Sequence, residues 1–425
     1  MSLNRDACGT LHLGGADLSE VLLDAGSPTY VYDLDAMAAE ARSLDAAFEG
    51  VPHLIAYAVK ANTAGAVVRT LAAAGCGADI VSRAELRVAM ASGVDPDRIV
   101  FSGVAKEDVE IDEAITAGAR GVAAIQLESV EEVARVAARA KALGRKARVG
   151  VRINPGIDLE GATHAHIATG HDTAKFGVAV ADVSRAVDLI ESLPELVLAG
   201  LGCHAGSQFT TLEPYLAAAR VVFDLVRDFR SVGRLRALVF VDSGGGFGVD
   251  YGGGCPVAPA DFVRASRAEQ RARNLSDLEL TIEPGRSLVA LHGVLLARVI
   301  QSKIASTRRW LMIDAGMNDL LRPALYGAYH PIVAVNQPPG EPLVSWRVVG
   351  PVCESSDDFG AHELSCDAPS AVAILGAGAY GYTMASVYNG RQLPAEVFVR
   401  AGRAVGRTAR RGVEAWVEER TRAGL

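Results

Sequence analysis

Short apolar runs alternate over the first two thirds of the chain with longer stretches whose apolar residues recur every three or four positions. The short runs predict strands at 53–59, 77–81, 98–102, 121–126, 148–154, 196–204, 237–246 and 278–286. The longer stretches predict helices, for example at 64–75, 83–93, 131–144 and 213–233, and several end in glycine. Eight strands interleaved with helices over about 250 residues predict a parallel (β/α)8 barrel, an α/β fold.

The pattern changes after residue 287. Apolar runs at 294–306, 308–317, 342–350 and 370–380 lack regular helices between them, which predicts a second, mostly antiparallel β domain. A short helix is expected at 408–423. The β-like segment 29–33 precedes the barrel and needs a sheet partner, so we expect it in the second domain. The predicted domains are therefore a barrel at 34–285 and a β-rich domain formed by 1–33 with 286–425.

Composition narrows the possible functions. The chain has 425 residues, half of them hydrophobic, and a formal net charge of −8, which argues against nucleic acid as the main partner. Six cysteines are scattered without a CxxC pair, so we expect free thiols and no metal site. We find neither a signal-peptide pattern nor an uncharged apolar run of about 18 residues, and therefore expect a cytoplasmic protein without a membrane contact.

Candidate chemistry gathers where the predicted strands end, which is where (β/α)8 barrels carry their reacting groups. Lys60 ends the apolar run 53–59. A lysine in that place is usually a solvated cap, but near low-dielectric walls it can lose its proton and attack a carbonyl. His204 follows the sixth predicted strand and, taken alone, is more often a structural residue than a catalytic one.

Two further motifs follow the seventh and eighth predicted strands. The run SGGGFG at 243–248 is either a flexible loop or a site where backbone N–H groups approach a phosphate. In EPGR at 283–286, Glu283 could hold a protonated ring nitrogen and Arg286 an anionic group, or the two could form an internal ion pair. A lysine for an aldehyde, glycines for a phosphate and a carboxylate for a ring nitrogen fit pyridoxal 5′-phosphate.

With these motifs in place, the chain resembles the fold-type III pyridoxal-phosphate decarboxylases. The resemblance spans most of the chain and is carried by YAVKAN (57–62), HAGSQ (204–208), DSGGGFG (242–248), EPGR (283–286), CESSD (353–357) and GAYGYTMASVYNG (378–390). Within the family, the chain is most similar to members that decarboxylate a diamino dicarboxylic acid to L-lysine, through residues 163–177, 314–332 and 353–357. One mild departure is Ala205, where a larger apolar residue is common.

The resemblance implies roles for single residues toward the cofactor. Lys60 would bond covalently to its aldehyde, His204 would stack on its ring, and Glu283 would keep the ring nitrogen protonated. The implied phosphate site consists of Gly244, Gly245, Gly246, Phe247, Gly248 and Gly285, with Ser207, Arg286 and Tyr380 close by.

Roles toward the substrate are implied as well. Arg286, Arg322 and Tyr326 would bind its distal carboxylate, with Tyr380 nearby, and Glu354 would bind its distal amine. Cys353 would be the proton donor, although without the resemblance CESSD predicts only a buried thiol next to an acid. Cys353 and Glu354 would reach the site from the second subunit of a homodimer.

Other functions stay open at this level. A related decarboxylase could act on another amino acid or on a carrier-bound substrate. An alanine racemase shares the fold class, but it needs a tyrosine as the opposing base where this chain has the thiol of Cys353. A non-catalytic pyridoxal-phosphate carrier is usually a barrel alone, whereas this chain has a second domain.

Overall fold

The computed structural model describes residues 3–157, 170, 174–254, 256–305 and 307–422. The chain divides into two compact units. The barrel unit consists of Ala39–Val249 and Cys255–Leu288, and the sheet unit consists of Met1–Ala38, Asp250–Gly254 and Val289–Leu425. Each unit is described by itself below.

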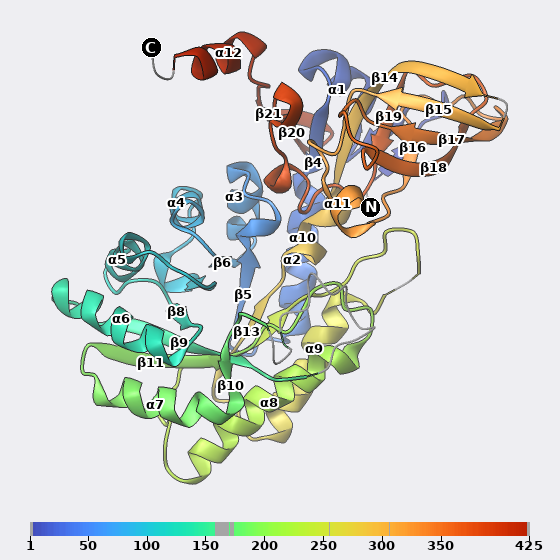
Figure 1. The fold of residues 1–425 in the computed structure, drawn as a ribbon. Coiled ribbons are helices and arrows are strands. Elements are labelled where there is room, and N and C mark those ends of the chain that lie inside the picture. Colours follow the sequence, from blue (N-terminus) through green and yellow to red (C-terminus); the bar gives the residue numbers. More distant parts are fainter. Residues whose placement is uncertain (1–2, 158–169, 171–173, 255, 306, 423–425) are drawn as a thin grey trace. The chain divides into compact units, whose positions relative to one another are not determined.

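Parallel strands form the barrel unit (Figure 1). Each strand pairs in parallel with the next, and the pairings of β13 with β5 and of β8 with β9 complete the ring. The predicted (β/α)8 barrel is thus confirmed. Its strands are β5 (His53–Ala58), β6 (Gly77–Ile80), β7 (Ile99–Phe101), β8 (Ala124–Leu127), β9 (Ala147–Asn154), β11 (Leu196–Gly202), β12 (Phe240–Gly245) and β13 (Glu279–Glu283). The two-residue strand β10 (Val178–Ala179) pairs with β9.

Helices follow the strands along the chain, as the hydrophobic spacing predicted. They are α2 (Leu34–Ala47), α3 (Gly65–Ala73), α4 (Arg83–Ala91), α5 (Asp108–Thr116), α6 (Val130–Ala142), α7 (Val183–Ser192), α8 (Leu212–Ser231) and α9 (Pro259–Ala272). Side-chain caps fix several starts: Oγ of Ser82 accepts from the backbone N–H of Glu85 at 3.3 Å. Glycines follow helix ends where φ is positive, for example Gly75 at 95° and Gly144 at 61°.

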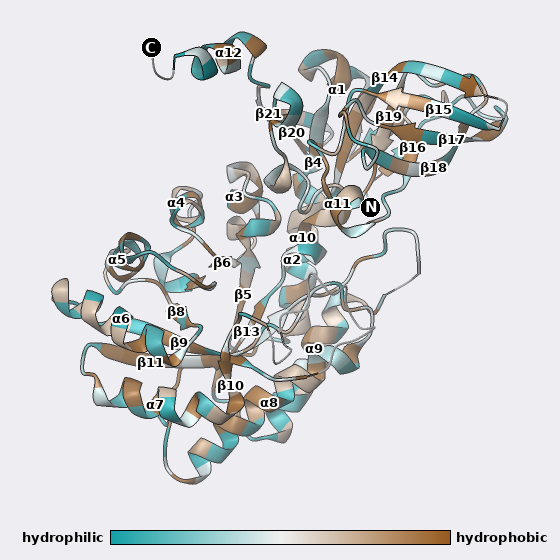
Figure 2. Ribbon diagram, in the orientation of Figure 1, coloured by the Kyte–Doolittle hydropathy of each residue, from teal (hydrophilic) through white to brown (hydrophobic). Residues whose placement is uncertain are grey.

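Burial explains why the barrel strands have near-continuous apolar runs. The four residues of β8 and the six of β12 are all buried, and in β5 only His53 is partly exposed. Strands covered on both faces favour apolar residues at every position rather than an alternating pattern. In Figure 2 these strands are mostly brown, whereas the helices carry both hydrophobic and hydrophilic residues. Buried polar residues inside such strands therefore need a specific partner.

A nine-stranded sheet dominates the sheet unit, with the path β18-β17-β15-β14-β4-β20-β21. Its strands are β4 (Thr29–Asp33), β14 (Gly293–Ala305), β15 (Arg308–Ile313), β16 (Ile332–Ala334), β17 (Leu343–Val349), β18 (Asp358–Ser365), β19 (Ala371–Ile374), β20 (Ala395–Arg400) and β21 (Arg403–Thr408). β4 pairs antiparallel with β14 and parallel with β20, which confirms the sheet partner expected for 29–33. A small antiparallel sheet holds β1 (Leu3–Arg5), β2 (Leu11–Leu13) and β3 (Ala16–Asp17).

Four further α-helices are described: α1 (Leu18–Ala25), α10 (Arg286–Val289), α11 (Arg322–Tyr326) and α12 (Val413–Thr421). The helix predicted at 408–423 was wrong at its start, because Thr408 pairs with Glu396 as the last residue of β21. In the described part of the chain, no helix combines the length and the apolar character needed to cross a membrane.

Candidate functional site

Lys60 lies in the short 3₁₀ helix Val59–Ala61, which directly follows β5. Its Nζ is 2.5 Å from Oδ2 of Asp79, which stands near the end of the neighbouring strand β6. Burial raises the pKa of the Asp79 carboxyl group, and the charge of Lys60 opposes this rise. Asp79 is therefore the residue that fixes the lysine, a role that sequence reasoning did not assign.

His204 and Glu283 form a second pair. His204 follows β11 and Glu283 ends β13, and Nδ1 of His204 is 2.9 Å from Oε2 of Glu283. Burial disfavours the charged form of Glu283, but the hydrogen bond and charge of His204 outweigh it, with help from Lys60 and Arg152. The pKa of Glu283 is consequently lowered. The structure thus brings together Lys60, His204 and Glu283, three residues that the sequence selected separately.

Arg152 supports this pair from β9. Its Nη2 donates to the backbone carbonyl of His204 at 3.1 Å, and its Nη1 donates to Oε1 of Glu128 at 3.0 Å. Glu128 also accepts from the backbone N–H groups of Gly103 and Gly177, at 2.8 and 2.9 Å. The arginine is buried with its charge paired, so it can fix the position of His204. No motif in the sequence pointed to it.

The glycine run at the end of β12 is packed backbone against backbone. A Cβ atom at Gly244 would lie 2.4 Å from the carbonyl oxygen of Cys203, and one at Gly245 would lie 1.9 Å from that of Glu283. At Gly246, where φ is 88°, a Cβ would lie 2.2 Å from the carbonyl oxygen of Gly206. No side chain fits at these positions. The loop can therefore present only backbone groups.

Phe247 departs from its glycine neighbours. Its ring is buried and stacks on Phe262 with a centroid distance of 4.9 Å, and it meets Tyr215 edge-on at 5.4 Å. The aromatic side chain therefore belongs to the core of the barrel unit. Only the backbone of Phe247 is left for a ligand.

Arg286 and Ser207 form a further polar contact in the barrel unit. Nη2 of Arg286 donates to Oγ of Ser207 at 3.0 Å, and the arginine is buried. Gly285, which precedes Arg286, is tightly packed, because a Cβ atom at this position would lie 3.0 Å from Cβ of Ala58. Glu283, the other charged residue of the EPGR motif, pairs with His204.

Arg322 and Tyr326 lie at the two ends of α11 in the sheet unit. The buried Arg322 donates from Nη1 to Nε2 of His330 at 2.7 Å, and its guanidinium lies 4.7 Å from the ring centre of Tyr251. Nδ1 of His330 is 2.9 Å from the carbonyl oxygen of Leu375. With Nδ1–H donating to that carbonyl, Nε2 is left as the acceptor for Arg322. His330 and Tyr251 are supports that the sequence did not reveal.

Cys353 and Glu354 occupy an exposed turn between β17 and β18. The backbone N–H of Cys353 donates to Oδ1 of Asn389 at 2.9 Å, and the hydroxyl of Tyr388 donates to Oε1 of Glu354 at 2.7 Å. Cys353 is thus an exposed thiol, and the buried thiol weighed from the CESSD motif alone is corrected.

Asp357 ties this turn to a second loop. Its two carboxylate oxygens accept from the backbone N–H groups of Val352 and Met317, both at 2.6 Å. The loop around Met317 leads into α11, which carries Arg322 and Tyr326. One buried carboxylate therefore connects the two segments of the sheet unit that hold most of its candidate substrate residues. Tyr380, the remaining candidate, is partly buried with φ at 55°.

Some expectations fall outside these clusters. Of the motif 163–177, residues 163–169 and 171–173 lie outside the described residues. Asn154, the last residue of β9, accepts from the backbone N–H of Gly156 at 3.0 Å through Oδ1. Among the described residues, no group of three or more His, Cys, Asp or Glu could hold a metal ion.

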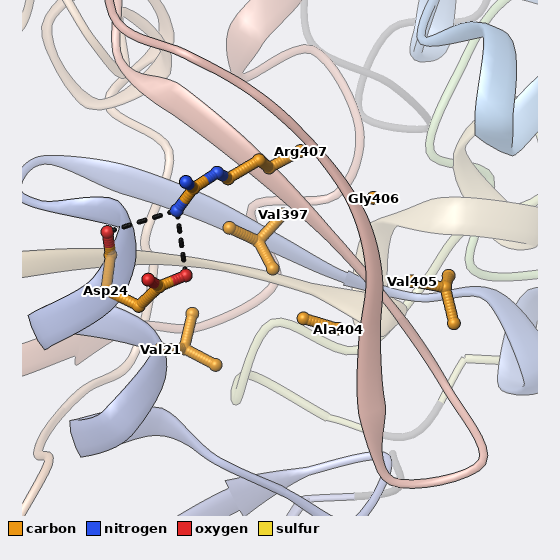
Figure 3. A pocket seen from close by; sticks show the side chains of 7 residues that line it. All are labelled: Val21, Asp24, Val397, Ala404, Val405, Gly406 and Arg407. Atoms are coloured by element: carbon orange, nitrogen blue, oxygen red, sulfur yellow. Dashed lines mark hydrogen bonds and ion pairs between the residues drawn. The ribbon is translucent and has the colours of Figure 1, made fainter.

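A pocket of about 310 Å³ in the sheet unit is unrelated to the candidates (Figure 3). It is lined by Val21, Asp24, Val397, Ala404, Val405, Gly406 and Arg407. Its only charged groups, Asp24 and Arg407, already pair with each other at 2.8 Å. The pocket offers no reactive group, so we do not assign it a function.

Comparisons with family models, curated proteins and solved structures all lead to the same group of decarboxylases. Residues 34–290 match the family model of the pyridoxal-dependent decarboxylase pyridoxal-binding domain. A diaminopimelate decarboxylase of Zymomonas mobilis is 40% identical over 412 residues, which cover 96% of this chain and 95% of the relative. The fold is similar to crystal structures of diaminopimelate decarboxylase in complex with L-lysine. That of Helicobacter pylori has a TM-score of 0.87 and 35% identity, and covers 95% of this chain and 100% of its own. That of M. jannaschii has a TM-score of 0.89 and 33% identity, and covers 98% of this chain and 97% of its own.

Proposed function

Because the chain belongs to the diaminopimelate decarboxylases within the pyridoxal-dependent decarboxylase family, we propose that it converts meso-2,6-diaminopimelate to L-lysine and carbon dioxide. The cofactor would be pyridoxal 5′-phosphate. The observation that carries the proposal is a cluster of charged residues in the barrel unit. Lys60 pairs with the buried Asp79, His204 pairs with Glu283, and the charge of Lys60 also acts on Glu283.

The residues present fit this cofactor. A phosphate needs backbone N–H groups at close range, and the glycine loop leaves no space for side chains at Gly244, Gly245 and Gly246. Ser207, held by Arg286, would add a hydroxyl donor. An ionised Glu283 would accept a hydrogen bond from a protonated ring nitrogen, and the lowered pKa of this carboxyl group supports that state.

When bound, pyridoxal phosphate would supply an electron sink for the electron pair left on the α-carbon by the departing carboxylate. Lys60 would hold the cofactor through Nζ, and Asp79 would position that nitrogen and accept its hydrogen bond. His204 would pack on the ring, with its orientation fixed by Glu283 on one side and by Arg152 on the backbone.

Binding of the far end of the substrate would fall to charged groups. The distal carboxylate would pair with Arg286, Arg322 and Tyr326, and the distal amine with Glu354. Arg322 is prepared for this task, because His330 fixes the position of its guanidinium through a neutral acceptor. A diamine precursor without a distal carboxylate would leave these arginines poorly compensated, which disfavours it.

The thiol of Cys353 would deliver the proton to the α-carbon after carbon dioxide leaves. The exposure of Cys353 and Glu354 in the single chain supports a site that is completed by a second copy. We therefore propose a homodimer in which these two residues act in the site of the other subunit.

The test is a substrate panel with the purified protein and added pyridoxal phosphate. Released carbon dioxide is measured with meso-diaminopimelate and, separately, with L-ornithine, L-lysine and L-arginine. The proposal expects release from diaminopimelate alone, with L-lysine as the product. Release from ornithine or from none of the four, with cofactor bound, would instead favour another amino acid or a carrier-bound substrate.

A further inference from the structure

Glu128, the residue that follows β8, is a buried acid on which three donors converge. Oε1 accepts from the backbone N–H of Gly103 at 2.8 Å and from Nη1 of Arg152 at 3.0 Å, and Oε2 accepts from the backbone N–H of Gly177 at 2.9 Å. Gly103 follows β7, Arg152 lies in β9 and Gly177 precedes β10. Since β7, β8 and β9 are neighbours in the barrel, one carboxylate connects the ends of three consecutive strands.

Arg152 connects Glu128 to His204. Its guanidinium donates through Nη1 to Glu128 and, at 3.1 Å, through Nη2 to the backbone carbonyl of His204. The same guanidinium lies 4.8 Å from the ring centre of Phe176, the residue before Gly177. Glu128 and Arg152 therefore hold the same short segment, one at the N–H of Gly177 and the other at the ring of Phe176. Because Arg152 is buried, loss of Glu128 would leave a buried cation without its carboxylate partner.

The backbone at Glu128 is itself fixed by a buried ion pair. Its N–H donates to Oε2 of Glu132 at 2.8 Å, and Oε1 of Glu132 is 3.0 Å from Nζ of Lys106. Lys106, which is 2% exposed, also donates to the carbonyl oxygens of Gly103 and Gln126, at 2.6 and 2.7 Å. Gly103 is thus held at its N–H by Glu128 and at its carbonyl by Lys106. The position of the Glu128 carboxylate is therefore set by the chain itself.

We propose that Glu128 is a positioning residue, which fixes His204 through Arg152 and so orients the imidazole for the cofactor ring. The role toward the ring rests on the proposed function, whereas the connection between Glu128, Arg152 and His204 does not. A carboxylate is required here, because its two oxygens accept from all three donors at once. A glutamine has only one accepting oxygen, so its NH2 group would face at least one N–H donor. Glu128→Gln therefore removes the charge and an acceptor while nearly keeping the shape.

Hydrogen–deuterium exchange on the purified full chain tests the connection itself. In Glu128→Gln, at least one of the backbone N–H groups of Gly103 and Gly177 loses its acceptor, so we expect faster exchange in the peptide that contains it. The matched control is Glu131→Gln, an exposed glutamate in the first turn of α6, which should leave both peptides unchanged. Unchanged exchange in both peptides of Glu128→Gln would overturn the proposal.

A double-mutant cycle tests whether Glu128 acts through Arg152. We expect Glu128→Gln to bind pyridoxal phosphate about tenfold more weakly than wild type, in the range for a lost hydrogen bond to a charged group. In an Arg152→Met background, which already lacks the donor to His204, the same substitution should weaken binding about twofold or less, because interacting residues do not contribute additively. The absorption maximum of the bound cofactor should shift in Glu128→Gln and in Arg152→Met, and stay unchanged in Glu131→Gln. Equal losses in the two backgrounds would overturn the proposal.

A folding defect would be decisive as well. If Glu128→Gln does not fold, the double variant with Arg152→Met should fold, because it removes the buried cation together with its partner. Misfolding of the double variant, while Arg152→Met alone folds, would contradict the role of Arg152 as the link. Failure of the substrate panel, with coupling still present in the cycle, would remove only the proposed reaction. Release of carbon dioxide without that coupling would remove only the role of Glu128.

Discussion

The barrel unit and the exposed turn of the sheet unit prepare their candidate groups in opposite ways. In the barrel unit, Lys60, His204 and Glu283 are tied through their side chains to largely buried partners of the same unit. In the sheet unit, Cys353 and Glu354 are exposed, and it is mainly the backbone of their turn that is fixed, by Asn389 and Asp357. A covalent anchor and a ring support must be rigid before substrate arrives. A proton donor must only be delivered at the right place.

The largest expected effect is at the anchor itself. Lys60→Ala removes the amine that Asp79 holds at 2.5 Å, so decarboxylation of diaminopimelate should fall below detection. Borohydride should no longer attach the cofactor to the protein. Carbon dioxide release and the mass of the protein after reduction measure both results. Lys303→Ala, an exposed lysine on β14, is the matched control and should keep both. A reduced cofactor still attached to Lys60→Ala would disprove the assignment.

The second prediction concerns the exposed thiol. Cys353→Ala should lower kcat by about 10²–10⁴-fold, the range for a lost general acid, without changing the melting temperature, because the side chain packs against little. Product formation and bound cofactor are measured side by side. The exposed Cys8 provides the control Cys8→Ala, which should be silent.

The proposed sharing of each site between two subunits allows an independent test of Cys353. Heterodimers of Cys353→Ala with Lys60→Ala should regain part of the activity if each site uses groups from two subunits. No regain in verified heterodimers would mean that the thiol acts within its own chain.

The third prediction concerns Glu283 in the barrel unit. Glu283→Gln removes the charge that His204 and the proposed ring nitrogen share, and kcat should fall by about 10²–10³-fold, as for a lost electrostatic contact. The titration of the cofactor absorbance should move as well. Glu279→Gln, at the other end of the same strand β13, is the control. If both variants lose activity equally, the effect belongs to the strand rather than to Glu283.

The contrast between the units also explains what could be predicted from the sequence. The barrel and the positions of Lys60 and Glu283 follow from local signals, namely apolar runs that end in a charged residue. Asp79 and Arg152 stand within buried strands, and their roles depend on a neighbour that lies far away in sequence. Periodicity contains no information about which strand comes to lie beside which polar residue.

The sheet unit shows the same limit in another form. The motif CESSD selected Cys353, but the exposure of the thiol and the role of Asp357 come from loops brought together by the sheet. The start of the last helix was misjudged because Thr408 has no local signal for its pairing with Glu396 in β20. Local signals predict elements and their ends, whereas pair contacts between loops require the fold.

The smallest predicted effect tests the tether of the exposed turn. Asp357→Ala leaves the backbone N–H groups of Val352 and Met317 without their acceptor, which should destabilise the sheet unit by about 1–3 kcal/mol. Cofactor binding in the barrel unit should stay unchanged, whereas the rate of alkylation of Cys353 should rise as the turn loosens. Asp358→Ala is the control, since Asp358 pairs with Arg347 on the neighbouring strand rather than with the turn. An unchanged alkylation rate in Asp357→Ala would show that the turn keeps its conformation without this carboxylate, and that the two units differ less than their contacts indicate.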